Sequence, residues 1–206
     1  MGSERIIEFN GYKICVNEET YEPSDDTKLL LDIIKINRGE KVVEVGSGSG
    51  ILGLYALING ASHVTFTDIN PYATLSTRCT LSLYNFTNYD IINCNILDCI
   101  RNKVFDVAIF NPPYLPVEEY DKWIGYSWSG GKSGVEILVN FLKSVKARRI
   151  YTIYSSLDDL DYLFYVINGL GYRISYSLEK TIGFETLTAI EIRNDKISDS
   201  GTRGFI

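Results

Sequence analysis

The sequence predicts an α/β fold built on a doubly wound, mostly parallel sheet of seven strands, with an antiparallel strand at the C-terminal end. The first observation is that apolar strand-like segments alternate with helix-like segments over most of the 206 residues. The second is a glycine-rich turn, Gly46-Ser-Gly-Ser-Gly50, between one such strand and the next helix. The third is that polar residues follow several strands at their carboxyl ends, where ligands bind in sheets of this kind.

The N-terminal segment is predicted to form a short β-hairpin over residues 5–16, because Asn10-Gly11 is a strong hairpin turn signal. Residues 21–27 lead into a helix in which Ser24 is a suitable N-cap. Two aspartates follow the serine and suit the positive end of a helix. A second interpretation is that residues 21–27 form a lid over a ligand, because they combine acids, a threonine and a tyrosine.

The remaining elements follow in chain order. A strand over residues 41–45 enters the glycine-rich turn, and a helix continues to about residue 59. A strand over residues 62–67 ends at Asp68, and Asn70-Pro71 supplies the N-cap and first residue of the next helix. Further strands are predicted over residues 89–94, 104–110, 149–155, 171–178 and 185–192, and further helices over residues 135–146 and 157–168.

Residues 1–193 are predicted to form a single domain, and the polar tail over residues 194–206 is expected to be disordered. Ser133 and Glu136 have the spacing of a capping box at the start of a helix. A basic cluster is expected at the solvated end of that helix and consists of Lys143, Lys146, Arg148 and Arg149.

The composition limits the classes of function. A net charge of −6 argues against a general affinity for nucleic acid. The sequence has no apolar run of membrane-spanning length and no apolar signal region, so a cytoplasmic location without membrane attachment is expected. The four cysteines form no C-x-x-C pair, which disfavours a zinc site. They are predicted to be small buried residues in a reducing compartment.

The stretch Asn111-Pro-Pro-Tyr114 follows the strand over residues 104–110 and forces a rigid, extended turn, because proline lacks a backbone donor and restricts its predecessor. The amide oxygen of Asn111 and the carbonyl of Pro112 can each accept one N–H, and Tyr114 can stack on a flat group. This set suits a planar substrate with an NH2 group. The alternative is an ordinary proline turn that closes a strand.

Two acids at strand ends suggest a bound ligand. Glu44 precedes the glycines, where burial of a carboxylate is unfavourable unless a cation pairs with it. Asp68, about 20 residues beyond the glycines, is placed for ribose hydroxyls. A nicotinamide-dependent oxidoreductase is disfavoured, because its fingerprint expects glycine where Ile51 stands.

With these motifs the chain resembles the class I S-adenosylmethionine-dependent methyltransferases of Rossmann-like fold. Among them it resembles the HemK-like release-factor glutamine methyltransferases of the archaeal and eukaryotic branch. The resemblance covers roughly residues 12–192. The motifs that carry it are Tyr21-Glu-Pro-Ser-Asp-Asp-Thr27, Glu44-Val-Gly-Ser-Gly-Ser-Gly50, Thr67-Asp-Ile-Asn-Pro71, Asn111-Pro-Pro-Tyr114 and Ser129-Gly-Gly-Lys-Ser-Gly134.

The resemblance implies roles for individual residues and no metal. The cofactor S-adenosylmethionine would be bound by Thr27, Glu44, Gly46, Gly48, Asp68 and Asn95. The family has aspartate where Asn95 stands, but an asparagine oxygen can still accept from the adenine amino group; Asp98 is a competing candidate for this position. The catalytic residues would be Asn111, Pro112 and Tyr114, and the substrate would be held by Asn111, Pro112, Pro113, Tyr114 and Trp128.

The resemblance also implies a substrate and a partner. The substrate would be the glutamine side-chain amide in the Gly-Gly-Gln motif of a peptide release factor. A small zinc-binding activator subunit would pair with the edge strand that runs from Tyr89 to Cys94. The first rival is methylation of an amino group of adenine or guanine in RNA or DNA, which the acidic charge disfavours. The second rival, a non-catalytic binding module, is disfavoured by the intact Asn111-Pro-Pro-Tyr114 turn.

Overall fold

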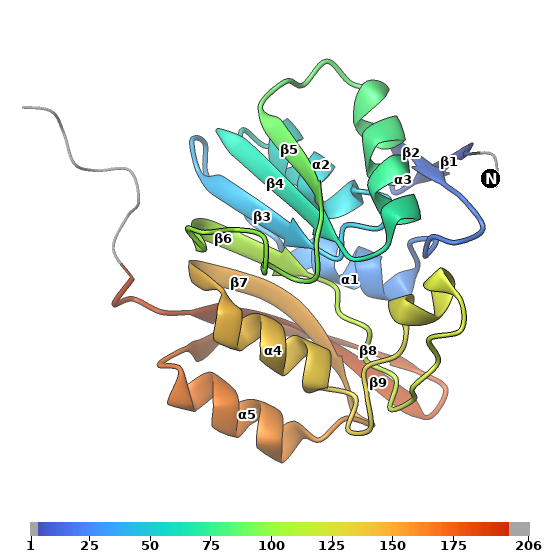
Figure 1. Ribbon diagram of the computed structural model, residues 1–206. Helices are drawn as coiled ribbons and strands as arrows, with labels where there is room; N and C mark the ends of the chain where they lie inside the picture. The colour runs from blue at the N-terminus through green and yellow to red at the C-terminus, as the bar shows by residue number, and fades with distance from the viewer. Residues whose placement is uncertain (1–3, 198–206) are drawn as a thin grey trace, which may run out of the picture.

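The structure is a computed structural model that describes residues 4–197, and its elements confirm the predicted α/β fold (Figure 1). In chain order these elements are β1 (Arg5–Phe9), β2 (Tyr12–Val16), α1 (Asp25–Ile33), β3 (Lys41–Val45), α2 (Ile51–Ile58), β4 (His63–Asp68), α3 (Pro71–Ser82), β5 (Tyr89–Asn93), β6 (Val104–Phe110), the 3-10 helix η1 (Trp123–Ser127), α4 (Glu136–Ser144), β7 (Lys146–Ser155), α5 (Leu160–Gly169), β8 (Arg173–Ile182) and β9 (Glu185–Arg193).

The main sheet has seven strands in the order β5-β4-β3-β6-β7-β9-β8. Its strands pair in parallel from β5 to β7, whereas β9 is antiparallel to both of its neighbours. The chain moves outward from β3 to β5 and then returns to the other side of β3 with β6. The switch point of this doubly wound sheet therefore lies between the carboxyl ends of β3 and β6.

Two apolar layers cover the sheet. One face of β3 contributes Val42 to a core that includes α1, α2 and the hairpin, and the other face contributes Val43 and Val45 to a core with α4 and α5. The alternation follows from the two-residue period of a strand. Figure 1 shows α4 and α5 together on one side of the sheet. Within residues 4–197, no helix is long and apolar enough to span a membrane.

The predicted N-terminal hairpin is confirmed. β1 and β2 pair antiparallel, and Asn10 and Gly11 both have positive φ angles, 49° and 82°, as a tight hairpin turn requires. The hairpin packs on α3, where the backbone N–H of Cys15 donates to Thr80 Oγ1 at 2.8 Å.

The prediction that the four cysteines are small buried residues of a reducing compartment is wrong in part, because only Cys15 and Cys94 are buried and all four form disulfides. Cys15 is bonded to Cys79 and Cys94 to Cys99, and the described residues contain no free cysteine. The first bond joins residues 64 positions apart, because the hairpin folds back onto α3. Cys99 is also exposed rather than buried. The disulfides remove the argument from cysteine chemistry for a reducing compartment.

The helix starts agree with the sequence in part. Asn70 caps α3 as predicted, since its side chain accepts from the backbone N–H of Tyr72 at 2.9 Å. Ser24 occupies the N-cap position of α1 but makes no side-chain capping bond. The capping box is incomplete: Glu136 accepts from the Ser133 N–H at 2.9 Å, but α4 begins at Glu136 itself.

The placement of the basic cluster at a helix end is wrong for three of its residues. Lys146, Arg148 and Arg149 lie in β7, and Arg149 is buried against Glu40. The first residues of the predicted disordered tail make defined contacts instead, because Asp195 pairs with Arg173 and Ile197 packs against the core. The rest of the predicted tail, residues 198–206, lies outside the described residues.

Candidate active site

A cavity of about 590 Å³ opens at the switch point of the sheet. Every site residue named from the sequence lies on its walls: Thr27, Glu44, Gly46, Gly48, Asp68, Asn95, Asn111, Pro112, Pro113, Tyr114 and Trp128. The strands bring them together because the carboxyl ends of parallel strands share one edge of the sheet. The cavity has an inner half along the glycine-rich turn and an outer half between the Asn111 turn and residues 120–128.

The glycine-rich turn forms the floor of the inner half. Gly46, Gly48 and Gly50 all have positive φ angles, a conformation that favours glycine. A Cβ atom on Gly46 would lie 2.9 Å from the Phe110 ring, so this position also requires a residue without a side chain. The turn therefore brings the backbone close to any ligand in the inner half.

Glu44 lies at this turn as a buried carboxyl group, only 2% exposed. Its Oε2 accepts from the backbone N–H of Gly53 at 2.8 Å. Burial raises the pKa of Glu44 to about 8, against the opposing effect of backbone hydrogen bonds from Gly53 and Leu52. Among residues 4–197, Glu44 forms no ion pair, so the inner half suits a ligand with a positive charge.

Asp68 is the second buried acid of the inner half. Its two oxygens accept from the backbone N–H groups of Gly48 and Asn70, at 2.9 and 2.8 Å. Burial raises the pKa of Asp68 to about 6, and these two hydrogen bonds partly offset the increase. The bonds fix the carboxyl group at the end of β4, where it can accept from hydroxyl groups of a ligand.

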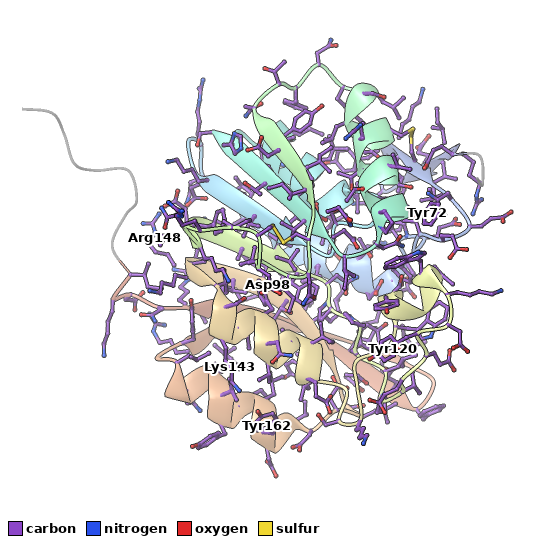
Figure 2. All side chains as sticks on the ribbon, viewed as in Figure 1. Tyr72, Asp98, Tyr120, Lys143, Arg148 and Tyr162 are labelled. Carbon is purple, nitrogen blue, oxygen red and sulfur yellow. A yellow bond between two sulfur atoms is a disulfide. The ribbon has the colours of Figure 1, made fainter. Side chains whose placement is uncertain are left out.

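Asn95 and Ile96 form one wall of the inner half, in the segment between β5 and β6. The Asn95 Nδ2 donates to Asp98 Oδ2 at 3.1 Å, which leaves the Asn95 oxygen available to accept. Asn95 lines the cavity and Asp98 does not, which favours Asn95 of the two candidates. Figure 2 labels Asp98 in this segment. Ile96 lines the cavity with a φ of 48°, which is rare for a β-branched residue.

The outer half is organised around the Asn111 side chain. Its Nδ2 donates to Asp26 Oδ2 at 3.0 Å and to Thr27 Oγ1 at 3.3 Å. Its Oδ1 is buried and has no hydrogen-bond partner among residues 4–197. Buried polar atoms are nearly always hydrogen-bonded, so an orphaned acceptor on a cavity wall suits an N–H donor of a ligand.

Two tyrosines flank Asn111. Tyr21 donates its hydroxyl to Asp26 Oδ1 at 2.9 Å. Burial, followed by the negative charge of Asp26, raises the pKa of Tyr21 and of Tyr114 above the usual range. Both phenols therefore stay neutral at physiological pH and act as hydrogen-bond donors and stacking surfaces rather than bases.

An aromatic wall of four residues closes the outer half and consists of Tyr120, Trp123, Tyr126 and Trp128. The Tyr126 ring lies 4.9 Å from the ring of Tyr120 and 5.4 Å from that of Trp123, between ring centroids. The Trp128 indole donates to Glu119 Oε2 at 3.0 Å, which fixes the ring. Figure 2 labels Tyr120 on this loop. The wall suits a thin or flat group that stacks between rings.

Three features of the site were missed in the sequence. Asp26 was interpreted as a charge at a helix start, whereas it binds the Asn111 amide. Gly53 was not singled out, yet a Cβ there would lie 2.7 Å from Glu44 Oε2 and 2.2 Å from the Phe66 ring. Of the aromatic wall, only Trp128 was assigned to the site from the sequence; Tyr120, Trp123 and Tyr126 were not connected with it.

Comparisons with known proteins show which family the chain is similar to. The chain matches the model of the methyltransferase small domain over residues 22–125. It is 32% identical over 193 residues to a Methanocaldococcus jannaschii protein provisionally named a protein N5-glutamine methyltransferase, with 90% of this chain and 97% of that protein covered. It is 29% identical over 192 residues to human methyltransferase HEMK2, with 84% and 89% covered.

The fold has a counterpart in a solved complex. The structure of the Mtq2–Trm112 complex of E. cuniculi, described as responsible for methylation of the eRF1 translation termination factor, matches with a TM-score of 0.64. The sequence identity is 23%, and the match covers 85% of this chain and 99% of that one. At this identity the likeness shows the fold alone.

Proposed function

The chain belongs to the methyltransferase small domain family, in its HemK-like group of protein glutamine methyltransferases, and we propose that it methylates a glutamine side-chain amide of a peptide release factor. The observation that carries the proposal is the orphaned Asn111 oxygen on the wall of the outer half of the cavity. It accepts an N–H, and the carbonyl of Pro112 is the second acceptor of the same turn. A primary amide has the two N–H groups that these acceptors need.

The proposed cofactor is S-adenosylmethionine, which supplies an electrophilic methyl group on a sulfonium. The buried acids fit it: Glu44 lacks a cationic partner among the described residues, and Asp68 is held by backbone bonds at a strand end. Thr27, Gly46 and Gly48 complete the proposed set on the cavity wall. The Asn95 oxygen accepts from the adenine amino group, because its NH2 group is already bonded to Asp98.

The catalytic contribution of this chain is mainly positioning. An amide nitrogen is a poor nucleophile, because its lone pair is delocalised into the carbonyl group. Hydrogen bonds from both of its N–H groups to Asn111 and Pro112 favour a pyramidal nitrogen and direct the lone pair towards the methyl donor. Tyr114 and the aromatic wall exclude water and fix the plane of the amide. No strong base is needed, because the methylated nitrogen releases its proton readily to water.

The outer half also supports a peptide substrate rather than a base in nucleic acid. The wall is aromatic, and the segment beside it, Glu118-Glu119-Tyr120-Asp121, is acidic. Nucleic-acid enzymes instead neutralise phosphates with cationic side chains. Glycines flanking the target, as in Gly-Gly-Gln, let a backbone pass between Tyr21 and Pro23 on one side of the cavity and Pro113 and Trp128 on the other. A cytoplasmic location follows from such a substrate.

The proposed partner is a small zinc-binding activator subunit on β5. β5 lies at the edge of the sheet and pairs only with β4 among the described strands. The outward edge has no proline or lysine, so it is open to strand addition. One similar protein of known structure, Mtq2 of E. cuniculi, was solved as a complex with Trm112, which supports a two-subunit enzyme here.

The decisive experiment is transfer of a labelled methyl group to four acceptors: an intact release factor, the same factor with Gly-Gly-Gln changed to Gly-Gly-Ala, total RNA and DNA. We expect incorporation into the intact factor alone, assayed with and without a candidate activator. Equal labelling of the factor and its alanine form contradicts the proposal, and labelling of RNA or DNA alone replaces it with the nucleic-acid alternative.

The role of Asn111 in this proposal is tested with the variant Asn111→Ala. Because Asn111 is proposed to hold the substrate amide, we expect the variant to keep cofactor affinity in calorimetry and to lose methyl transfer by about 100-fold or more. Near-normal turnover by this variant would show that the amide is held in another way.

A further inference from the structure

We infer that Asp26 is a positioning residue that sets the direction of the Asn111 amide, so that an oxygen and not an NH2 group faces the substrate. The inference rests on the proposed function, since it concerns the same outer half of the cavity. It adds a residue that neither the sequence motifs nor the comparisons assign to the reaction.

The first observation is that the contacts of Asp26 fix which atom of Asn111 it faces. A carboxylate oxygen only accepts hydrogen bonds, so the group of Asn111 that lies 3.0 Å from Asp26 Oδ2 must be the NH2 group. Asp26 is only 4% exposed, which keeps water from competing for this bond. The Asn111 oxygen must therefore lie on the other side of the amide, where it has no partner among the described residues.

The second observation is that Asp26 is itself held by three other donor groups, and one of them is the Thr27 hydroxyl, which donates to Oδ1 at 3.2 Å. The same Oδ1 accepts from the Tyr21 hydroxyl at 2.9 Å and from the backbone N–H of Thr27 at 2.6 Å. These donors come from the segment before α1 and from the helix itself. They hold the carboxylate plane, so Oδ2 is the oxygen left to orient Asn111.

The Asp26→Asn substitution should reverse the orientation of the Asn111 amide. The atom that replaces Oδ1 must still be an oxygen, because Tyr21 and Thr27 both donate to it. The new NH2 group therefore takes the place of Oδ2, facing Asn111. Two NH2 groups cannot bond to each other, so the Asn111 amide turns over. The Thr27 hydroxyl, which accepts from the Asn111 NH2 group at 3.3 Å in the wild type, then donates to the Asn111 oxygen instead. It then presents an NH2 group to the N–H groups of the substrate, where an acceptor is needed.

The test compares Asp26→Asn with the matched control Asp25→Asn in the full chain. Both variants remove one acid from the first turn of α1, but Asp25 is half-exposed and pairs with Lys180 on the surface. We expect Asp26→Asn to lower kcat/KM for methyl transfer by about 100-fold, the scale for loss of one bond to a reacting group. We expect Asp25→Asn to remain within about three-fold of the wild type.

A second variant distinguishes orientation from a general structural role. In Asp26→Asn combined with Asn111→Asp, the carboxylate introduced at position 111 accepts through one oxygen from the NH2 group introduced at position 26. It presents its other oxygen to the substrate. We expect this double variant to exceed Asp26→Asn in kcat/KM by about ten-fold or more. If the double variant is no better than Asp26→Asn, or if Asp26→Asn matches its Asp25 control, the inference is overturned.

The wild-type chain gives a readout that does not depend on the substrate. The signals of the two Asn111 side-chain N–H protons can be assigned by their loss in Asn111→Ala. In NMR spectra these protons should exchange slowly with solvent, because one of them is bonded to buried Asp26. Fast exchange of both protons would overturn the inference whatever the enzyme methylates. If the protons exchange slowly but the chain labels no release factor, the proposed function fails while the positioning role of Asp26 stands.

Discussion

Two glutamates lie at opposite ends of β3, and both are buried. Glu40 precedes the first residue of the strand and is 6% exposed, whereas Glu44 lies near its carboxyl end and is 2% exposed. Glu40 pairs with Arg149, a bond that joins residues 109 positions apart. Glu44 is bonded only to backbone N–H groups, and burial raises its pKa to about 8.

The difference separates a structural acid from an acid placed for a ligand. Around Glu40 the fold supplies its own cations, and the Arg149 guanidinium also donates to the Lys35 carbonyl at 2.8 Å. Around Glu44 the described chain supplies none. Arg148 is close to Glu40 and Tyr120 lines the cavity, and Figure 2 shows these two labelled residues at opposite sides of the molecule. A buried carboxyl group alone is therefore no sign of function; what distinguishes Glu44 is that no cationic side chain among residues 4–197 pairs with it.

The largest effect is expected from Arg149→Met. Removing the guanidinium leaves Glu40 buried beside a weaker contact with Arg148, at 3.7 Å. We expect the free energy of unfolding to fall by about 3–5 kcal/mol, with cofactor affinity unchanged. Urea unfolding and calorimetry measure the two quantities. The control is the double variant with Glu40→Gln, which should recover part of the stability. If the free energy of unfolding of Arg149→Met fell by less than about 1 kcal/mol, Glu40 would not differ from Glu44 in its need for a cationic partner.

A smaller effect of opposite sign is expected from Glu44→Gln. The folded pKa of about 8 lies above the ordinary value of 4.5, so the native state of the ligand-free chain binds the proton more tightly than the unfolded state. The stability contributed by the protonated group is complete below pH 4.5 and declines as the pH rises towards 8. The variant should therefore be more stable than the wild type at pH 8, by about 2–4 kcal/mol, and similar at pH 4.

The same variant should bind the cofactor more weakly, by about 10- to 100-fold, because a charged partner is lost. Unfolding curves at several pH values and calorimetry test the two expectations together. A Glu44→Gln chain that is less stable at pH 8, or that binds the cofactor as tightly as the wild type, would place Glu44 with Glu40 as a structural acid.

The smallest effect is expected from Asp98→Ala, because Asp98 lies behind Asn95 and does not itself line the cavity. The bond from Asn95 to Asp98 is open to water, so its loss should cost about 1 kcal/mol or less. We expect cofactor affinity to fall by about three-fold with no change in stability. Asp98→Asn is the matched control, because its oxygen can still accept from Asn95. Equal weakening by both variants would argue for a charge effect instead.

The sequence predicted the parts of the site that depend on strand order. Glu44, Asp68 and Asn111 each lie within one residue of the end of a strand, and parallel strands place their carboxyl ends at one edge. The order of strands and helices was predictable because hydrophobic periodicity is local along the chain. The edge position of β5 was also predicted, and the sheet order confirms it.

The pairings between distant side chains could not be predicted in the same way. Asn111 meets Asp26 across 85 positions, and Cys15 meets Cys79 across 64. Such contacts depend on how α1 and the hairpin pack against the sheet, and no local pattern encodes that packing. Arg149 illustrates the error that results: a run of basic residues suggested a solvated helix end, but the strand pairing of β7 carries this side chain inward.

The orphaned Asn111 oxygen has a consequence for the extent of the reaction. In the proposed function the turn offers two acceptors, the Asn111 amide oxygen and the Pro112 carbonyl, to a nitrogen with two hydrogens. A nitrogen that has received a methyl group has one hydrogen left, so one acceptor would stay buried without a donor, which costs about 1–3 kcal/mol. The methylated amide is therefore held less well than the unmethylated one. Because the site binds a nitrogen with two hydrogens better than one with a single hydrogen, it releases its product after one methyl group and does not add a second.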